Sequence, residues 1–227
     1  SSSSAAVRGP MGEGTIAWMT QPWTHYAVDP DDPRAPPMDV WERMTAEERE
    51  RVVASLPSEF PALEASPPEG DPHFNAKIGA RDALGGYFAR TGRKVYLASE
   101  LAVYYPGERM FAPDLMAVRD VELHERMQWV VALEIHVAGD RRKDLVRNAE
   151  RYAHLGIPEY FIFDRGRARL TGYRLPSPEA RIYRPIVPQG GRYASHVLGL
   201  DLVMEGVRLR FYAGNAPVLE AGELGRG

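Results

Sequence analysis

Three side chains in the middle of this chain are of types that proteins seldom bury. Glu134 is the one charged residue in the apolar stretch 129–137, and His136 follows two residues later, which in a strand places both on one face. Asp114 lies in a second apolar stretch, 111–118. Because burying an unpaired carboxylate costs several kcal/mol, each acid requires a cation, a proton or an arginine beside it.

These carboxylates have two possible uses. If the two stretches are neighbouring strands, Asp114 and Glu134 can converge on one spot, and oxygen ligands of this kind are what a hard cation such as Mg²⁺ binds. This arrangement indicates a metal site for hydrolysis. The alternative is an ion pair within the core, in which the partner of each acid would be one of Arg119, Arg142 and Arg147.

A basic helix is expected downstream of these acids, at about 140–155, with Gly156 as its stop signal. Lys143, Arg147 and Arg151 follow one another at spacings of four and form one stripe, while apolar residues lie on the other side. A basic stripe near two carboxylates suits a phosphodiester backbone, where affinity comes mainly from charge. The alternative is an ordinary solvated helix face.

The elements that position these residues follow from hydrophobic period and from turn residues. A short helix is expected at about 46–56, opened by a capping box of Thr45 and Glu48, and a longer one from Asp71 to Gly92. Strands are expected near 94–105, 111–118, 128–137, 159–163, 169–175, 181–187 and 208–212. This order predicts a mixed α/β domain built on one central sheet.

Composition excludes several classes of protein. The 227 residues include 28 basic and 31 acidic side chains and no Cys, which excludes a disulfide scaffold and thiolate metal sites. Residues 1–72 carry 13 acids and 5 bases and are rich in Pro, so 1–40 is expected to wander over the surface. No stretch is long and apolar enough to span a membrane, and no signal peptide is evident. A cytoplasmic protein without a membrane partner is therefore expected.

Several segments together resemble one known family. They are PDL (113–115), LEI (133–135), RRKDLVRNAERYAHLGIPEYFIFD (141–164), LTGYRL (170–175) and GGRYASHVLGLDL (190–202). This series is similar to the Uma-two (Uma2) family, which comprises bacterial endonuclease-like proteins of the PD-(D/E)xK superfamily, and the resemblance covers roughly residues 73–212. It implies an α/β fold in which a restriction-endonuclease-like mixed central sheet is flanked by helices. The domain would occupy 73–227, behind an irregular, acidic N-terminal extension, 1–72, with one short helix.

The resemblance also implies a site and a substrate. Asp114 and Glu134 would ligate Mg²⁺ or Mn²⁺, with the Ile135 carbonyl as a further ligand, and the metal would activate a water for attack on a phosphodiester bond of DNA. Lys143, Arg147 and Arg151 would meet the backbone phosphates. Because superfamily members commonly dimerise, a homodimer is expected by analogy.

The chain departs from the family pattern at the expected lysine. The superfamily has Lys two residues after the Glu, where His136 stands here, and the alternative helix position holds Asn148. Lys143 could reach in from a neighbouring turn, and His136 could orient a water, accept a proton or be a satisfied core histidine. Two other functions follow. One is a catalytically inactive module of the same fold that binds nucleic acid or protein, and the other is an unrelated α/β enzyme for a small metabolite.

Overall fold

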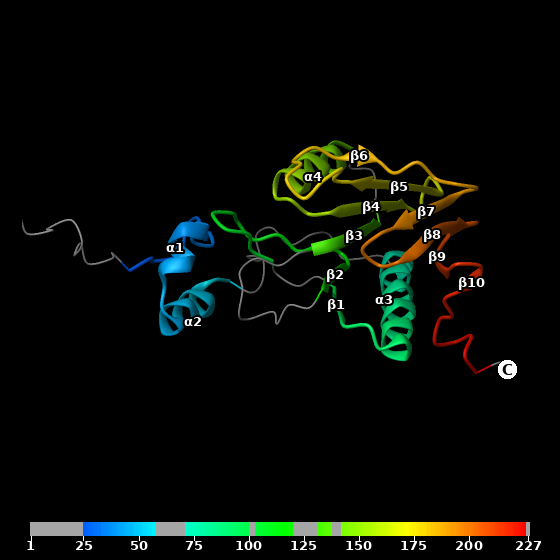
Figure 1. Cartoon of the computed structure of the whole chain (residues 1–227), viewed down its shortest axis with the longest axis horizontal. Helices are drawn as coiled ribbons and strands as arrows, with labels where there is room; N and C mark the ends of the chain where they lie inside the picture. The colour runs from blue at the N-terminus through cyan, green and yellow to red at the C-terminus, as the bar shows by residue number, and fades with distance from the viewer. Residues whose placement is uncertain (1–24, 58–70, 100–102, 120–130, 138–141, 226–227) are drawn as a thin grey trace, which may run out of the picture.

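The structure is a computed structural model of the chain. It describes residues 25–57, 71–99, 103–119, 131–137 and 142–225, with the backbone alone at 71–74, 119, 131–137 and 142–145. The described helices are α1 (Met38–Arg43), α2 (Ala46–Ser55), α3 (Asp71–Thr91) and α4 (Arg142–His154). The described strands are β1 (Val95–Ala98), β2 (Met116–Arg119), β3 (Val131–Val137), β4 (Glu159–Asp164), β5 (Arg169–Arg174), β6 (Arg184–Pro185), β7 (Arg192–Ser195), β8 (Leu200–Glu205), β9 (Arg208–Ala213) and β10 (Ala216–Pro217) (Figure 1).

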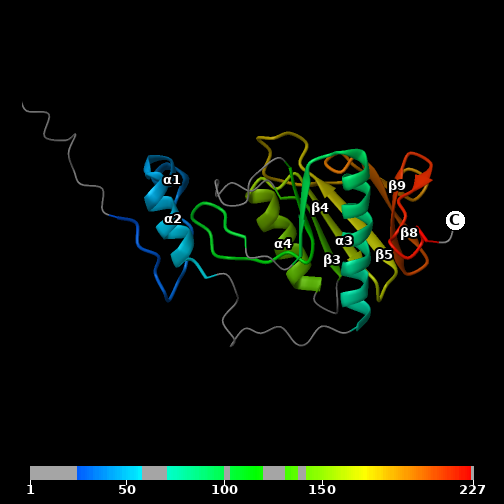
Figure 2. The same ribbon diagram turned by 90° about the horizontal axis from the view of Figure 1, so that it is seen from below.

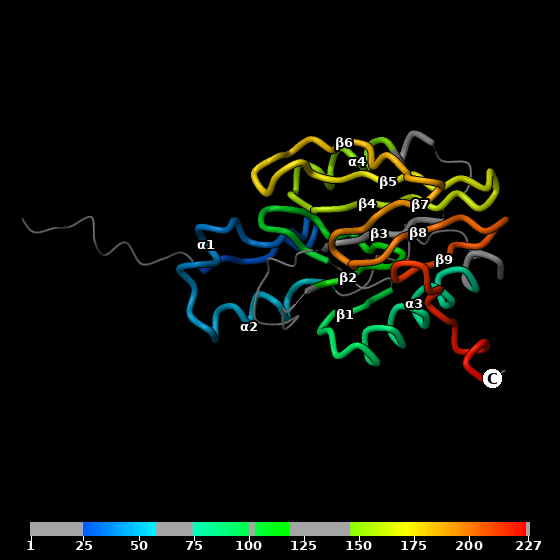
Figure 3. The backbone as a smooth tube through the Cα atoms, turned by 45° about the vertical axis from the view of Figure 1, so that its right-hand side comes forward, coloured from blue at the N-terminus to red at the C-terminus, as the bar shows by residue number. Residues whose placement is uncertain are grey.

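Two sheets form the body of the molecule. The larger has the order β1-β2-β3-β4-β5-β6, which Figure 3 shows as successive strands, and the smaller has the order β10-β9-β8-β7. Within the larger sheet β3 and β4 are parallel, because α4 carries the chain back between them, and the other neighbours are antiparallel. The predicted mixed central sheet flanked by helices is confirmed. The expectation of a single sheet is wrong, because the strand predicted at 208–212 lies in the smaller sheet as β9.

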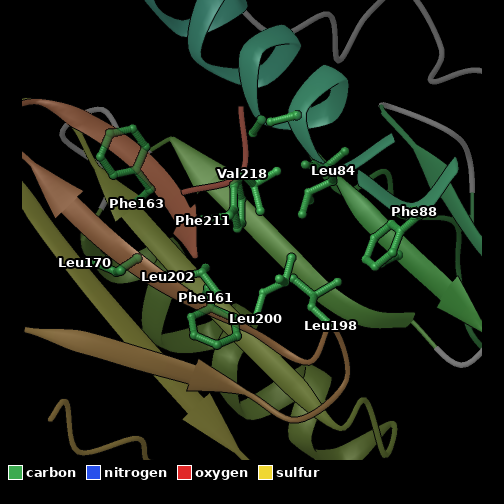
Figure 4. Packing of buried hydrophobic residues seen from close by; sticks show 14 of the residues in the cluster. Leu84, Phe88, Phe161, Phe163, Leu170, Leu198, Leu200, Leu202, Phe211 and Val218 are labelled. Carbon is green, nitrogen blue, oxygen red and sulfur yellow. The ribbon is translucent and has the colours of Figure 1, made fainter. Parts of the chain in front are cut away.

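The two helices near the larger sheet cover opposite faces (Figure 2). On one face, Leu84 and Phe88 of α3 pack with Phe161 and Phe163 of β4 and with the smaller sheet (Figure 4). On the other face, Tyr152 of α4 joins a second cluster that includes residues of β2 and β4. The central strands therefore have apolar side chains on both faces, as expected for strands that are buried on both sides.

Local signals explain the elements that the sequence predicted well. All six residues of β4 are buried, which accounts for its continuous apolar run. After α4 the chain adopts a positive φ of 81° at Gly156, and Ile157 donates its N–H to the Tyr152 carbonyl, so the helix ends in a Schellman-type cap. The capping box of Thr45 and Glu48 at α2 is also formed.

Other predicted elements are shorter or were missed. Among the described residues of the expected strand 94–105, those of β1 pair in the sheet and Val103 forms an isolated bridge with Phe111. The expected strand 111–118 begins only at Met116. The expected strand 181–187 is reduced to β6, and β7, β8 and β10 were not predicted from the residue pattern. Strand bounds and pairing depend on the neighbours that each residue meets across the sheet, which hydrophobic period alone does not reveal.

The described part of the extension is more ordered than its composition suggests. Trp41 of α1 and Val52 of α2 are buried together, and Ala35 donates its N–H to the carbonyl of Glu108. Of residues 1–40, which were expected to wander over the surface, 25–40 are described: Ala35 and Pro36 are buried, and the others are exposed or partly exposed. Residues 1–24 lie outside the described residues. No helix in the described ranges is long and apolar enough to cross a membrane.

Candidate active site at one edge of the central sheet

Strand directions gather the candidate residues at one edge of the larger sheet. Because β2 and β3 are antiparallel, β3 and β4 parallel, and β4 and β5 antiparallel, β2 and β5 begin at the edge where β3 and β4 end. Asp114 lies two residues before β2, and Asp164 and Arg169 flank the turn from β4 to β5. Asp114 therefore lies at the same edge as the ends of β3 and β4 and the start of β5.

Glu134 lies on β3, next to β2, the strand that Asp114 precedes. The backbone register pairs Glu134 with Met116, so the two acidic positions are separated by one strand spacing and two residues along it. Ile135 pairs with Phe161 on the other side. The side chains of Glu134, His136 and Lys143 lie outside the described residues, so the structure locates these residues by their backbone alone.

Asp114 has a cationic partner that the sequence did not predict. Its Oδ1 lies 3.7 Å from Nζ of Lys77 in α3, and only 16% of the Asp114 side chain and 5% of the Lys77 side chain are exposed. Leu115 and Met116, which follow Asp114, are fully buried. An ion pair of Asp114 is thus present, with a cation from α3 that was not among Arg119, Arg142 and Arg147. The side chains of Arg119 and Arg142 lie outside the described residues.

A signal for Lys77 exists in the sequence. Lys77, Ala80, Leu84 and Phe88 follow one another at helical spacings of three and four, and the last three are core residues. Lys77 thus occupies an apolar position of an amphipathic helix, where a charged residue requires a partner. The long side chain of lysine lets the ammonium group reach past the helix surface to the carboxylate.

The basic stripe on α4 divides between two environments. Arg147 is exposed. Arg151, near the C-terminal end of α4, donates to the Arg109 carbonyl at 3.2 Å, lies 3.7 Å from the Glu108 carboxylate and has its guanidinium 5.0 Å from the centre of the Phe111 ring. Since α4 runs back from the end of β3 to the start of β4, Arg151 lies toward the opposite edge, where it holds the 108–111 segment.

A second buried carboxylate has a structural role at that opposite edge. Glu159, at the start of β4, is 1% exposed and accepts hydrogen bonds from Arg174 Nε at 3.1 Å, Ser195 Oγ at 2.6 Å and the His196 N–H at 2.7 Å. These donors come from β5, from the end of β7 and from the turn that follows β7. Glu159 therefore joins the two sheets, which explains why a charged residue begins a buried strand.

The oxygen donors at the first edge fit a hard divalent cation in their chemistry. Asp114 supplies a carboxylate that remains partly exposed, and Glu134 stands on the adjacent strand. Among the described side chains, no group of three or more His, Cys, Asp or Glu residues is placed to hold a metal ion. Any cation here would share Asp114 with the ammonium group of Lys77.

Comparison with known proteins agrees with this architecture. A family described as "Uma2: Putative restriction endonuclease" matches residues 62–205. A solved structure described as a putative nuclease belonging to DUF820, from Anabaena variabilis, is 13% identical and has a TM-score of 0.50, covering 69% of this chain and 95% of that one. No curated protein matches the chain. The shared fold confirms the restriction-endonuclease-like architecture that the resemblance implied.

Proposed function

From the premise that the chain belongs to the Uma2 family, we propose that it is a divalent-metal-dependent endonuclease that hydrolyses phosphodiester bonds in DNA. The observation that carries this proposal is the Asp114 carboxylate, partly buried at the sheet edge, one strand away from Glu134. An acid in that environment needs compensation by positive charge, which both a buried lysine and a metal ion can supply.

Each residue has a role in the proposed reaction. Asp114, Glu134 and the Ile135 carbonyl would hold Mg²⁺ or Mn²⁺, which when bound supplies a more acidic water and positive charge near the phosphate. We assign His136 to the attacking water, because a neutral imidazole can accept a proton near neutral pH. Lys143 would supply a further positive charge to the phosphate.

Arg147 is the exposed member of the α4 stripe, and we assign it to a neighbouring phosphate. Arg151 was given the same role from its spacing, but its contacts with Glu108 and Phe111 support a structural role. A homodimer remains a proposal, and light scattering from the full chain tests it: a mass near 25.4 kDa would reject the dimer.

A second function, an inactive module that binds nucleic acid or protein, is favoured by one observation. Lys77 already supplies positive charge to Asp114, so the fold can stabilise this carboxylate without a metal ion. His136 and Asn148, at the two positions where the family pattern has lysine, point the same way. The two functions differ in whether a cation binds and whether DNA is cut.

The deciding experiment is a calorimetric titration of Mn²⁺ into the full chain, with Asp114→Asn as the matched variant because it removes the charge and keeps the shape. Saturable binding that is lost in the variant, together with Mn²⁺-dependent nicking of supercoiled plasmid, would support the nuclease. Circular dichroism must first show that the variant is folded. Absence of binding by the parent, with and without DNA, would reject the nuclease and leave the inactive module.

A further inference from the structure

The turn between β4 and β5 presents three arginines at the edge of the sheet that carries Asp114. Arg165 is half-buried, and Arg167 and Arg169 are exposed. Against them stands one acid, Asp164, so the six residues of 164–169 have an excess of two positive charges. None of the three belongs to the α4 stripe that the sequence singled out for phosphate binding.

Hydrogen bonds fix the shape of this turn. Asp164 is largely buried, and it accepts the Arg167 N–H on Oδ1 at 3.0 Å and Arg167 Nη1 on Oδ2 at 3.2 Å. Ala168 donates its N–H to the Arg165 carbonyl at 3.2 Å and has a φ of +48°. One guanidinium is therefore held in place before any ligand arrives, which lowers the entropy lost on binding.

The arginines border a hollow on each side of the turn, each of about 340 Å³. Arg165 borders the one on the α3 side, between α3 and the start of β9. Arg167 and Arg169 border the one on the α4 side, beside the N-terminal half of that helix. The hollow on the α3 side is also lined by Arg208 and Glu220, and the one on the α4 side by Val146 and Asp164.

We propose that this turn, residues 164–169, binds the phosphate backbone of duplex DNA beside the edge that carries Asp114. The inference rests on the proposed function and extends it with a contact surface for the substrate. Arginine suits this role because its planar fork donates two parallel hydrogen bonds to a phosphate. An acidic protein could also be attracted by the positive charge of the turn. The planar guanidinium fork and the position of the turn beside the edge that carries Asp114 favour a phosphodiester.

The spacing of the strands predicts which phosphates the turn contacts. Neighbouring strands lie ~4.8 Å apart, so β4 and β5 are about 10–14 Å from β2, before which Asp114 lies. For a duplex whose axis runs across the strands, with ~3.4 Å of axial rise per base pair, this separation corresponds to roughly three to four nucleotides. The turn therefore contacts the backbone three to four nucleotides from the phosphate nearest Asp114.

The test measures DNA binding without cleavage. A labelled 20-base-pair duplex is titrated with the full chain in EDTA, and fluorescence anisotropy gives the Kd at several salt concentrations. The test variant is Arg167→Gln/Arg169→Gln. The charge-matched control is Arg181→Gln/Arg184→Gln, which also removes two exposed arginines, but Arg184 pairs with Arg174 and so lies at the opposite edge. Circular dichroism and thermal melting check that both are folded.

The test variant should flatten the plot of log K against log salt by about 2, because each phosphate contact contributes roughly 0.9 to the slope. Between ~50 and ~200 mM salt the parent should then lose about tenfold more affinity than the test variant. The control should keep the slope of the parent. An equal decrease of the slope in both variants, or no decrease in the test variant, would overturn the proposal.

Two further outcomes separate this inference from the proposed function. Binding through the turn by a parent that cuts no DNA with any metal would reject the nuclease and retain the surface. If the parent cuts DNA and the test variant binds DNA as the parent does, the nuclease is retained and the surface is rejected. If polyglutamate of equal charge displaces the duplex as efficiently as unlabelled DNA does, the surface binds acidic protein and the proposal is overturned.

Discussion

Replacing Lys77 with methionine tests whether Asp114 depends on the lysine for its charge balance. Methionine keeps an unbranched side chain of similar length, so the change removes the ammonium group and leaves most of the packing. At an effective dielectric constant of about 20, two unit charges 3.7 Å apart attract each other by about 4.5 kcal/mol. Removing one partner of a buried ion pair costs about 3–5 kcal/mol.

We therefore expect Lys77→Met to lower the free energy of unfolding by about 3–5 kcal/mol at neutral pH in EDTA, measured by urea denaturation followed by circular dichroism. The matched controls are Asp114→Asn and the double variant Lys77→Met/Asp114→Asn. If the charges interact as the structure indicates, the double variant should lose less stability than the sum of the single variants, by roughly 2–3 kcal/mol. A loss below ~1 kcal/mol in Lys77→Met, with additive controls, would refute the reasoning.

The same variant tests whether the Lys77 ammonium group competes with a metal ion for the Asp114 carboxylate. If the proposed divalent cation binds the Asp114 carboxylate beside Lys77, Lys77→Met should bind Mn²⁺ at least about tenfold more tightly than the parent, a difference of ~1.4 kcal/mol. A Mn²⁺ concentration of ~100 times the Kd should then restore about 2.7 kcal/mol of the lost stability. Unchanged Mn²⁺ affinity would mean that the lysine and the metal do not share this carboxylate.

Three further predictions concern the frame around the site. Ala168→Gly should stabilise the chain by about 1 kcal/mol in thermal melting, because glycine adopts the positive φ of 48° without strain; a lower melting temperature would contradict this. Gly172→Ala should destabilise it by about 1–3 kcal/mol in urea, because a Cβ there would lie 2.8 Å from the Phe161 ring; an unchanged midpoint would mean that the ring moves freely. Hydrogen bonds from Arg109 and Arg34 hold the pKa of Asp32 below its ordinary value of 3.8. The stability that the Asp32 carboxylate contributes is therefore present at neutral pH and is lost as the pH falls through the lowered pKa. Hydrogen exchange at residues 32–36 should therefore accelerate, relative to that of the central strands, below about pH 4 in the parent, and Asp32→Asn should remove this dependence.

Local signals in the sequence predicted the elements that depend on near neighbours. The capping box at Thr45, the stop of α4 at Gly156 and the buried run of β4 are all decided by residues within a few positions of one another. The family motifs anticipated the restriction-endonuclease-like fold, which the structural comparison confirms. Asp114 and Glu134 were singled out because each is a charged residue within an apolar stretch, where burial of an unpaired carboxylate is costly.

Contacts between distant segments required the tertiary structure. Lys77 and Asp114 meet because α3 packs on the sheet face beside β2, and Arg151 holds the 108–111 segment because α4 returns to the opposite edge. The α4 stripe was visible in the sequence, but its spacing carries no information about which end lies near Asp114. Strand order and direction decide that, and they bring the arginines of the β4–β5 turn to the same edge as Asp114. Helical period and turn residues act over a few residues, whereas sheet topology joins segments far apart in the chain. This is why the sequence could propose the two acids, and only the fold showed Lys77 beside Asp114.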